Sequence, residues 1–309
     1  MLASATSAEN RAGILAMLVG MALFVVNDAM MKLASAHFPT GQMLLVRGVF
    51  ATAAVLAIVF ALGEARKLGR LAQPFVAARA LIEAVISFLF ITALARAPLA
   101  DLTAILQATP IIVTLLLVVL GLERVGWRRW VAILVGFAGV LLIVRPGTVA
   151  FDVNAMLALA AAVLVAVRDL ITRLIHADTP SIVVVLGTTV TVGVVGPLIG
   201  GALGESWQPV LRAETLLLVV AAVLYGCGNM AVVMAFRKAD VSAVSPFRYA
   251  SVVFALAIGF SVFGEFPDAI ALAGFALVVG AGLYAWHRER IRRHAALGQT
   301  ARGREESGS

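Results

Sequence analysis

Charged residues are scarce in this sequence of 309 residues: Asp, Glu, Lys and Arg make up only 13%, whereas hydrophobic residues make up 62%. A soluble domain averages about 25% charged and about 45–50% apolar residues. So few polar groups cannot cover the surface of a soluble protein of this size, which excludes that class. The mean hydropathy of +1.03 predicts an integral membrane protein.

The residues and motifs of common catalytic and metal sites are also missing. A single cysteine, Cys227, excludes an internal disulfide framework. The four histidines fall in expected loops or the tail, without the spacing of metal ligands: His37, His176, His287 and His294. The sequence contains no Gly-x4-Gly-Lys-[Ser/Thr], no His-Glu-x-x-His and no Gly-x-Ser-x-Gly. We therefore expect no metal site, no cofactor, no ATP hydrolysis and no enzymatic activity.

Ten segments are apolar over the roughly 20 residues that a helix needs to cross a bilayer. They lie at residues 12–33, 43–62, 75–95, 99–121, 128–145, 153–175, 181–203, 214–236, 241–263 and 268–286. Helices are expected because the segments are continuously apolar and lack the alternating pattern of barrel strands. The sequence predicts an all-α polytopic membrane protein with ten transmembrane helices and, at 289–309, a disordered cytoplasmic tail.

Basic residues are distributed unevenly between the two sides of this predicted membrane protein. With a cytoplasmic N-terminus, sixteen lie in inner loops or the tail and four on the outer side, namely Lys32, Arg96, Arg145 and Arg212. This distribution follows the positive-inside rule, so we expect both termini to be cytoplasmic in a bacterial-type inner membrane. It also explains the net charge of +7 without nucleic acid as a partner.

A charged signature occurs once in each half of the chain. Its members have counterparts 141 residues later: Asp28, Lys32 and Pro39 recur as Asp169, Arg173 and Pro180. A further pair, Glu123 and Glu265, is 142 residues apart. Because internal repeats fix the architecture, we predict two copies of one unit, at 12–147 and 150–288.

Each predicted unit contains five spans, and this odd number has a geometric consequence. The first unit begins on the inner side of the membrane and the second begins on the outer side. The sequence therefore predicts two inverted five-helix repeats, related by a pseudo-two-fold axis in the membrane plane. Transporters with this layout hold their substrate near the midplane between the repeats, and access alternates between the two sides.

Charged residues inside the spans are candidate functional residues, because a charge at the bilayer centre costs about 2.5–3.5 kcal/mol or more. Glu83 lies four residues after Arg79 on the same helix face. The two form either a neutralising ion pair or a site where Glu83 binds a proton or a cation. Asp28 and Asp169 each precede a basic residue by four positions, Lys32 and Arg173 respectively. These pairs either stabilise helix ends or couple transport to an ion.

Two arginines, Arg47 and Arg248, have no acidic residue at helical spacing in their own segments. A guanidinium can hold a carboxylate through two parallel hydrogen bonds, so either could bind an organic anion. Pairing with Glu83 or Asp28 is the alternative. Arg168 and Asp169 are adjacent and point about 100° apart around a helix, so we expect one of them to face a cavity. The uncharged candidates for substrate binding are Gln107, Tyr225, Asn229 and Tyr249.

Three other features have structural interpretations. Pro110 should free a backbone carbonyl in the fourth span, beside Gln107 and Thr109. The Gly-x-x-x-Gly spacing of Gly196 and Gly200 indicates either packing within the bundle or a homodimer contact. Glu123 and Glu265 follow apolar segments, and we expect them to cap helices or to connect loops.

Short motifs also occur near the ends of both halves. They are Gly121-Leu-Glu-Arg-Val-Gly-Trp-Arg-Arg-Trp130, Gly136-Phe-Ala-Gly139 and Arg145-Pro-Gly147, then Ser245-Pro-Phe-Arg-Tyr249, Phe263-Gly-Glu-Phe-Pro-Asp268 and Gly282-Leu-Tyr284. They resemble EamA-type transporters of the drug/metabolite transporter superfamily. The opening Asn27-Asp-Ala-Met-Met-Lys32 resembles the branch that includes bacterial S-adenosylmethionine carriers. The resemblance implies a central cavity lined by the first, third, fourth, sixth, eighth and ninth helices.

The sequence thus predicts a secondary active transporter that moves a small organic metabolite by alternating access, through proton coupling or exchange. S-Adenosylmethionine or an amino-acid-like solute is the expected substrate. The alternatives are a drug/metabolite efflux permease, an intramembrane enzyme or a non-transporting scaffold. A scaffold would leave the charges inside the membrane unexplained. The expected partners are the solute, the lipid bilayer and, in one alternative, a second copy of the chain.

Overall fold

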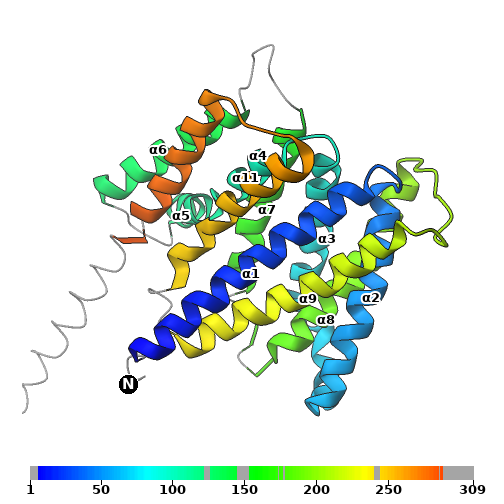
Figure 1. Ribbon diagram of the computed structural model, residues 1–309. Coiled ribbons are helices and arrows are strands. Elements are labelled where there is room, and N and C mark those ends of the chain that lie inside the picture. The colour runs from blue at the N-terminus through cyan, green and yellow to red at the C-terminus, as the bar shows by residue number, and fades with distance from the viewer. Residues whose placement is uncertain are drawn as a thin grey trace, which may run out of the picture.

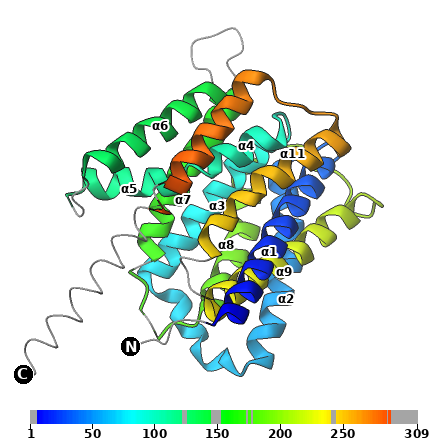
Figure 2. The ribbon, with the colours of Figure 1, turned by 60° about the vertical axis from the view of Figure 1, so that its left-hand side comes forward.

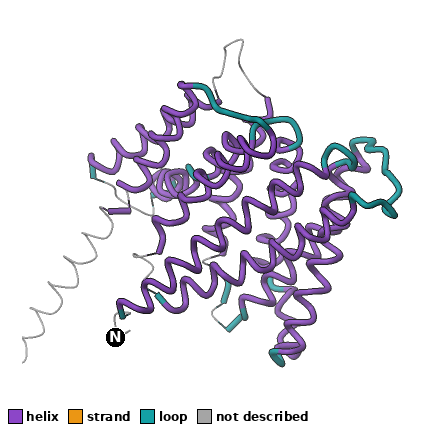
Figure 3. The backbone as a smooth tube through the Cα atoms, in the orientation of Figure 1, coloured by secondary structure: helices purple, strands orange, loops and turns teal. Residues whose placement is uncertain are grey.

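A computed structural model describes residues 6–121, 126–144, 153–172, 174–176, 178–239, 244–284 and 286–287 of the chain. Within these ranges every regular element is a helix, and no strand occurs (Figure 3). The predicted all-α class is therefore confirmed.

The helices of the first half are α1 (Ser7–Ala34), α2 (Thr40–Ala61), the 3-10 helix η1 (Glu64–Ala72), α3 (Pro74–Leu94), α4 (Leu99–Leu106), α5 (Thr109–Val119) and α6 (Trp127–Val144) (Figure 1). Those of the second half are α7 (Val153–Thr172), α8 (Ser181–Ala202), α9 (Thr215–Lys238), the 3-10 helix η2 (Ser245–Tyr249), α11 (Ala250–Phe263) and a final helix, Ala269–Tyr284. Eight segments of the described chain are long and apolar enough to cross a membrane, with α4 and α5 counted together. Two further apolar helices are shorter, at Trp130–Val144 and Ala269–Tyr284. The chain is a multi-pass membrane protein.

Proline begins several of these helices. The repeated prolines, Pro39 and Pro180, are the extended N-cap residues of α2 and α8. Pro98 precedes α4 in the same way, and Pro74 is the first residue of α3. Proline suits the start of a helix because its missing N–H has no intrahelical partner there. The repeated proline therefore has the same local structure in both halves.

Proline also interrupts one span that the sequence predicted as continuous, 99–121, and lies at a 3-10 segment of another, 241–263. Helix α4 ends at Leu106, and α5 begins after a turn, with Pro110 in its first turn. Pro110 cannot donate to the Leu106 carbonyl, and Thr109 Oγ1 donates to it instead, at 2.6 Å. The prediction that Pro110 removes the backbone donor of this carbonyl is thus confirmed, and the Thr109 hydroxyl takes the place of that donor. Pro246 similarly begins η2, which leads into α11.

The two halves of the chain are packed into each other. Helix α1 packs along α9, α2 packs along α8, and α3 contacts both α7 and α8. In Figures 1 and 2 the blue α1 and the yellow α9 run side by side. Helix α6 lies beside the final helix in both views, away from α2 and α8. Any cavity at the centre is therefore bounded by helices of both halves.

Glycine permits the closest of these approaches. A Cβ added to Gly48 of α2 would lie 2.5 Å from the Cα of Gly193 in α8. The glycines of the Gly-x-x-x-Gly spacing contact α2 as well, Gly196 through Leu44 and Gly200 through Gly41. This spacing therefore serves packing within the bundle, as small residues do between membrane helices.

An ion pair joins the two halves at the edge where α1, α3, α8 and α11 end, along the upper and right-hand side of Figure 1. Lys32 of α1 pairs with Glu265, which follows α11, and also donates to the Ala97 carbonyl at 2.6 Å. Glu265 accepts from the Leu99 N–H at 3.1 Å, an amide that begins α4 and has no intrahelical acceptor. The structural role predicted for Glu265 is confirmed. The expected Asp28–Lys32 pair is wrong, because the ammonium of Lys32 reaches across to the other half.

The same edge carries a second set of polar contacts. The Gln42 side chain of α2 donates to the Gln208 carbonyl at 2.5 Å and accepts from the Gln208 N–H at 2.8 Å. Glu205 accepts from the Gly41 N–H at 2.8 Å. These hydrogen bonds connect the start of α2 to the loop between α8 and α9. We call this edge, with the Lys32–Glu265 pair, the outer edge, because the distribution of basic residues predicts that it faces away from the cytoplasm.

Candidate functional site

A cavity of about 450 Å³ lies among helices of both halves. Its walls come from α1, α2, α3, α4 with α5, α7, α9, and η2 with α11. These include all six helices that the family resemblance implied, and α2 adds Arg47. The charged lining residues are Asp28, Arg47, Arg79, Glu83, Arg168, Asp169 and Arg248. The volume is within the range of small-molecule pockets, roughly 300–1,000 Å³.

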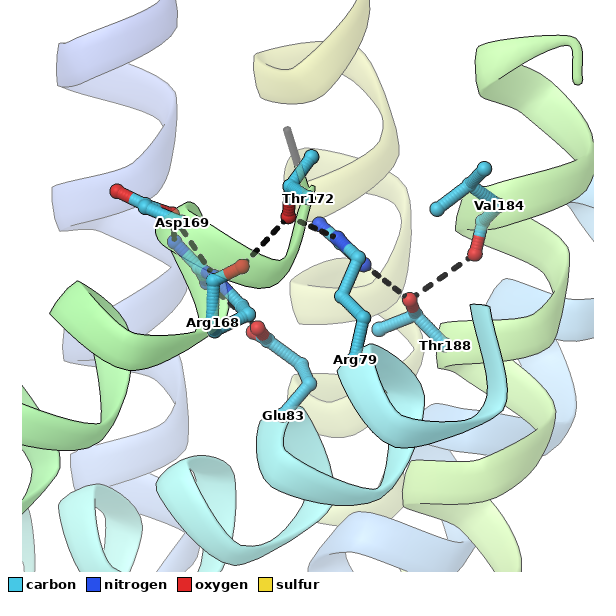
Figure 4. Close-up of polar contacts among 7 residues, drawn as sticks. All are labelled: Arg79, Glu83, Arg168, Asp169, Thr172, Val184 and Thr188. Atoms are coloured by element: carbon cyan, nitrogen blue, oxygen red, sulfur yellow. Dashed lines mark hydrogen bonds and ion pairs between the residues drawn. The ribbon is translucent and has the colours of Figure 1, made fainter. Parts of the chain in front are cut away.

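Arg168 of α7 is the centre of an ion-pair network in this cavity (Figure 4). Its Nη1 donates to Glu83 Oε2 of α3 at 2.5 Å, while Nη2 and Nε donate to Asp169 Oδ1 at 2.7 and 3.1 Å. The side chains of Arg168 and Glu83 are only 19% and 11% exposed. A buried pair of this kind is strongly destabilised when one partner is removed. The network therefore fastens α3 to α7, and Arg168 pairs with both carboxylates.

Arg79 of α3 is held by hydroxyl groups instead of an acid. Its Nε donates to Thr172 Oγ1 at 3.1 Å, and its Nη1 donates to Thr188 Oγ1 at 2.6 Å (Figure 4). Both threonines donate to carbonyls of their own helices. Of the two alternatives for Arg79 and Glu83, the neutralising ion pair within α3 is therefore excluded. Sharing a helix face does not bring them together, because Glu83 extends to Arg168 on the facing helix.

Arg47 of α2 is a buried guanidinium without an anionic partner. It lies over the ring of Tyr225 in α9, with its central carbon 5.3 Å from the ring centroid. The Tyr225 ring in turn packs against Phe24 of α1, at a centroid distance of 5.8 Å. Within the described part of the chain, Arg47 forms neither a hydrogen bond nor an ion pair, so the structure does not contain the alternative pairing with Glu83 or Asp28, and Arg47 lines the cavity instead. The cation–π contact leaves its N–H groups available.

Asp28 of α1 is a cavity carboxylate without a cationic partner among the described residues, just as Arg47 is a cation without an anionic one. It accepts one hydrogen bond, from Asn27 Nδ2 at 2.9 Å. Among the described residues no cation lies within ion-pair distance of it, since Lys32 is engaged at the outer edge. Asn27 is itself 2% exposed and lines the cavity.

The turn between α4 and α5 and the 3-10 helix η2 meet at the same cavity. Gln107, at the turn between α4 and α5, donates through Nε2 to the Arg248 carbonyl of η2 at 2.7 Å. Both residues line the cavity. In α9, Asn229 Nδ2 donates to the carbonyl of Tyr225 at 2.8 Å.

A family model described as the EamA-like transporter family matches this sequence twice, at residues 11–145 and 153–285. The two matches cover one half of the chain each. The chain belongs to the EamA-like transporter family. It is therefore a membrane transporter of small molecules, and the resemblance drawn from its motifs is confirmed.

Three curated relatives illustrate the range of this family. An S-adenosylmethionine uptake transporter of Rickettsia felis is 25% identical over 85% of this chain and 88% of its own length. A pseudopaline exporter of Pseudomonas aeruginosa is 27% identical over 87% of this chain and 94% of its own length. A riboflavin transporter of Vibrio cholerae is 31% identical, over 55% and 57% respectively.

One solved crystal structure has the same overall fold as this EamA-like transporter. The TM-score is 0.60 at 22% sequence identity, and the match covers 87% of this chain and 96% of the other. At this identity the similarity shows the fold alone.

The cavity brings together most residues that the sequence singled out. Seven of the eight substrate-binding candidates line it: Arg47, Glu83, Gln107, Arg168, Tyr225, Asn229 and Arg248. The coupling candidates Asp28, Arg79 and Asp169 do so too. Both Arg168 and Asp169 face it, although only one was expected. The described residues contain no group of three or more His, Cys, Asp or Glu side chains able to hold a metal ion.

Three candidates are elsewhere. The ring of Tyr249 packs against Gly282 of the final helix, outside the cavity lining. Lys32 is at the outer edge, and Arg173, like Glu123, lies outside the described residues. Sequence reasoning missed Asn27 and Phe24 of α1. For Asn27 the signal was present, since it is a polar residue beside Asp28 in an apolar span.

Proposed function

We propose that this EamA-like transporter is a secondary carrier with ten membrane-spanning helices, in two inverted repeats at 12–147 and 150–288. The eight long spans and the two shorter apolar helices each overlap one predicted span, which supports this count. The uneven distribution of basic residues supports cytoplasmic termini in an inner membrane. The solute moves by alternating access between the repeats.

The observation that carries this proposal is a cavity walled by both halves that holds an unpaired guanidinium, Arg47. A buried cation without a protein anion gains most from an anionic ligand. A carboxylate can accept two parallel hydrogen bonds from it. Tyr225 and Phe24 supply aromatic surface beside the guanidinium for a planar group. S-Adenosylmethionine, which has a carboxylate and an adenine ring, fits this arrangement and is the solute named for the Rickettsia relative.

A drug/metabolite efflux permease is the second candidate. The similarity to the pseudopaline exporter, which covers 94% of that protein, favours it. The two candidates share the cavity and the alternating cycle and differ in the direction of net transport. Coupling to a proton or exchange for another solute would set that direction. An enzymatic role has no support from the family or from the cavity residues.

Counterflow in proteoliposomes tests the carrier function. Purified protein is reconstituted into liposomes that contain unlabelled S-adenosylmethionine, and labelled S-adenosylmethionine is added outside at low concentration. A carrier exchanges the two and transiently accumulates label inside. The Arg47→Gln variant should lose this accumulation, whereas Arg70→Gln, which changes an arginine of η1 outside the cavity, 3.9 Å from Asp178, should keep it. Failure of a panel of amino acids, nucleosides and S-adenosylmethionine to exchange would overturn the proposal.

A further inference from the structure

We propose that Asn27 and Asp28 of α1, together with Arg47 of α2, bind an α-amino-acid head of the substrate. The ammonium is held by Asn27 and Asp28, and the carboxylate is held by Arg47. This inference rests on the carrier function proposed above and narrows its substrate to solutes with a free α-ammonium and a free α-carboxylate. We call these three residues the head site.

Asn27 supplies an acceptor that nothing in the described chain uses. In the structure its amide nitrogen donates to Asp28 Oδ1 at 2.9 Å, so the Asn27 carbonyl oxygen points away from that carboxyl group. The Asn27 Oδ1 atom is then buried without a hydrogen-bond partner among the described residues. Leaving such an acceptor unsatisfied is costly. Since Asn27 lines the cavity, a donor from a ligand can reach it.

Asp28 supplies the negative charge. The other two carboxylates of the cavity, Glu83 and Asp169, are both paired with Arg168. Asp28 is thus the cavity carboxylate that has no cationic partner among the described residues. A primary ammonium carries three N–H donors. The Asp28 carboxylate and the Asn27 carbonyl oxygen, on neighbouring residues, offer it a charged and a neutral acceptor together.

Arg47 supplies the opposite charge. It lines the same cavity as Asp28, yet no ion pair joins the two among the described residues. Two opposite charges in one pocket that do not neutralise each other match a zwitterion. A neutral solute, or an anion without an ammonium, would leave Asp28 and the Asn27 oxygen unpaired. Sites built to bond a polar group discriminate strongly against ligands that lack it.

The repeat provides an independent comparison. The positions 141 residues after Asn27 and Asp28 are Arg168 and Asp169. In the second half the arginine pairs with its neighbouring aspartate, at 2.7 Å, and with Glu83 as well. In the first half an asparagine stands at that position, so Asp28 keeps its charge free. The equivalent pair therefore forms a structural network in one half and an open binding group in the other.

A comparison of four ligands with two variants tests the head site. Binding to purified protein is measured for S-adenosylmethionine, S-adenosylhomocysteine, decarboxylated S-adenosylmethionine and 5′-methylthioadenosine. Asp28→Asn should weaken the three ligands that carry an ammonium by roughly 10- to 100-fold, as expected for a charged hydrogen bond, and leave 5′-methylthioadenosine unchanged. Arg47→Gln should weaken only the two that carry a carboxylate. The matched control is Asp178→Asn, whose side chain is 83% exposed in a loop, and it should change none.

The outcomes separate this inference from the carrier function. An equal loss of affinity for all four ligands, or no loss for any, would overturn the head site. The first result is that of a misfolded variant, and the second means that the substituted residue does not contact the ligand. A loss for S-adenosylmethionine without one for S-adenosylhomocysteine would assign Asp28 to the sulfonium instead and overturn it as well. Counterflow only of a solute without an amino-acid head, such as riboflavin, would refute the head site and keep the carrier. Counterflow of no solute would refute the carrier itself.

Discussion

The ion pair between Lys32 and Glu265 should resist opening of the outer edge. It connects the end of α1 in the first half with the residue after α11 in the second. Lys32→Met removes the ammonium and keeps an unbranched side chain. Glu265 is then left with the Leu99 N–H at 3.1 Å as its remaining described donor. We expect this single change to destabilise the closed arrangement of the outer edge.

The magnitude follows from the burial of the two side chains, which are 10% and 25% exposed. Breaking a buried pair costs about 3–5 kcal/mol, whereas exposed pairs contribute about 0–1 kcal/mol. Because Glu265 is a quarter exposed, we place this pair at about 2–3 kcal/mol. If the pair separates whenever the cavity opens outward, its loss raises the ratio of outward-open to closed protein roughly 30- to 150-fold.

A cavity cysteine reports this ratio. Ser87 lines the cavity, so Ser87→Cys in a Cys227→Ser background can be labelled by a membrane-impermeant maleimide added to intact cells. The labelling rate should rise with Lys32→Met and return toward the starting value in the exchanged pair Lys32→Glu with Glu265→Lys. Lys67→Met removes a similar pair on the exposed η1, with Glu64 at 3.0 Å, and should have no effect. An unchanged labelling rate in a folded Lys32→Met protein would refute the gating role.

Three further changes have defined expectations. Glu83→Gln should lower the free energy of unfolding by about 2 kcal/mol or more, because Arg168 loses its main buried partner. Counterflow and proton-driven uptake should fall together. A selective loss of proton-driven uptake would instead make Glu83 the coupling group. Gly48→Ala should destabilise the protein in thermal unfolding by about 1–3 kcal/mol, since its Cβ would meet Gly193 at 2.5 Å, whereas Gly201→Ala, which points into open space, should not. Thr109→Val should cost about 1–2 kcal/mol by leaving the Leu106 carbonyl unsatisfied, measured by the same unfolding assay with Thr109→Ser as the control that keeps the bond.

The helices were predictable because they depend on local composition. An apolar run of about 20 residues in a membrane protein has few alternatives to a helix. The helix starts at Pro39 and Pro180 follow from the chemistry of proline alone. The interruption at Pro110 was visible as a freed carbonyl, but the turn that splits α4 from α5 depends on the polar contacts of Gln107 with the other half.

The partners of the charges were not predictable, because each choice depends on how helices face one another. Spacing within one helix placed Arg79 beside Glu83 and Lys32 beside Asp28. The structure instead pairs Glu83 with a residue 85 positions away and Lys32 with one 233 positions away. The sequence singled out Arg47 because no acidic residue lies at helical spacing from it, and among the described residues the folded protein also gives it no acidic partner. The free oxygen of Asn27 has no signature in sequence, since it exists only because the amide nitrogen is occupied and the site is buried.

The asymmetry between the halves explains how a duplicated scaffold can bind an asymmetric solute. Two repeats with identical side chains would present the same groups to both sides of the cavity, related by the pseudo-two-fold axis. At the pair where the repeats carry Asn27–Asp28 and Arg168–Asp169, one substitution changes this. Arg168 pairs with two carboxylates, Glu83 and Asp169, and so ties α3 to α7. Asn27 instead leaves the Asp28 carboxylate and its own carbonyl oxygen for a ligand. Under the proposed alternating access, the backbone symmetry serves the motion, and the proposed head site belongs to α1 and α2 of the first repeat alone.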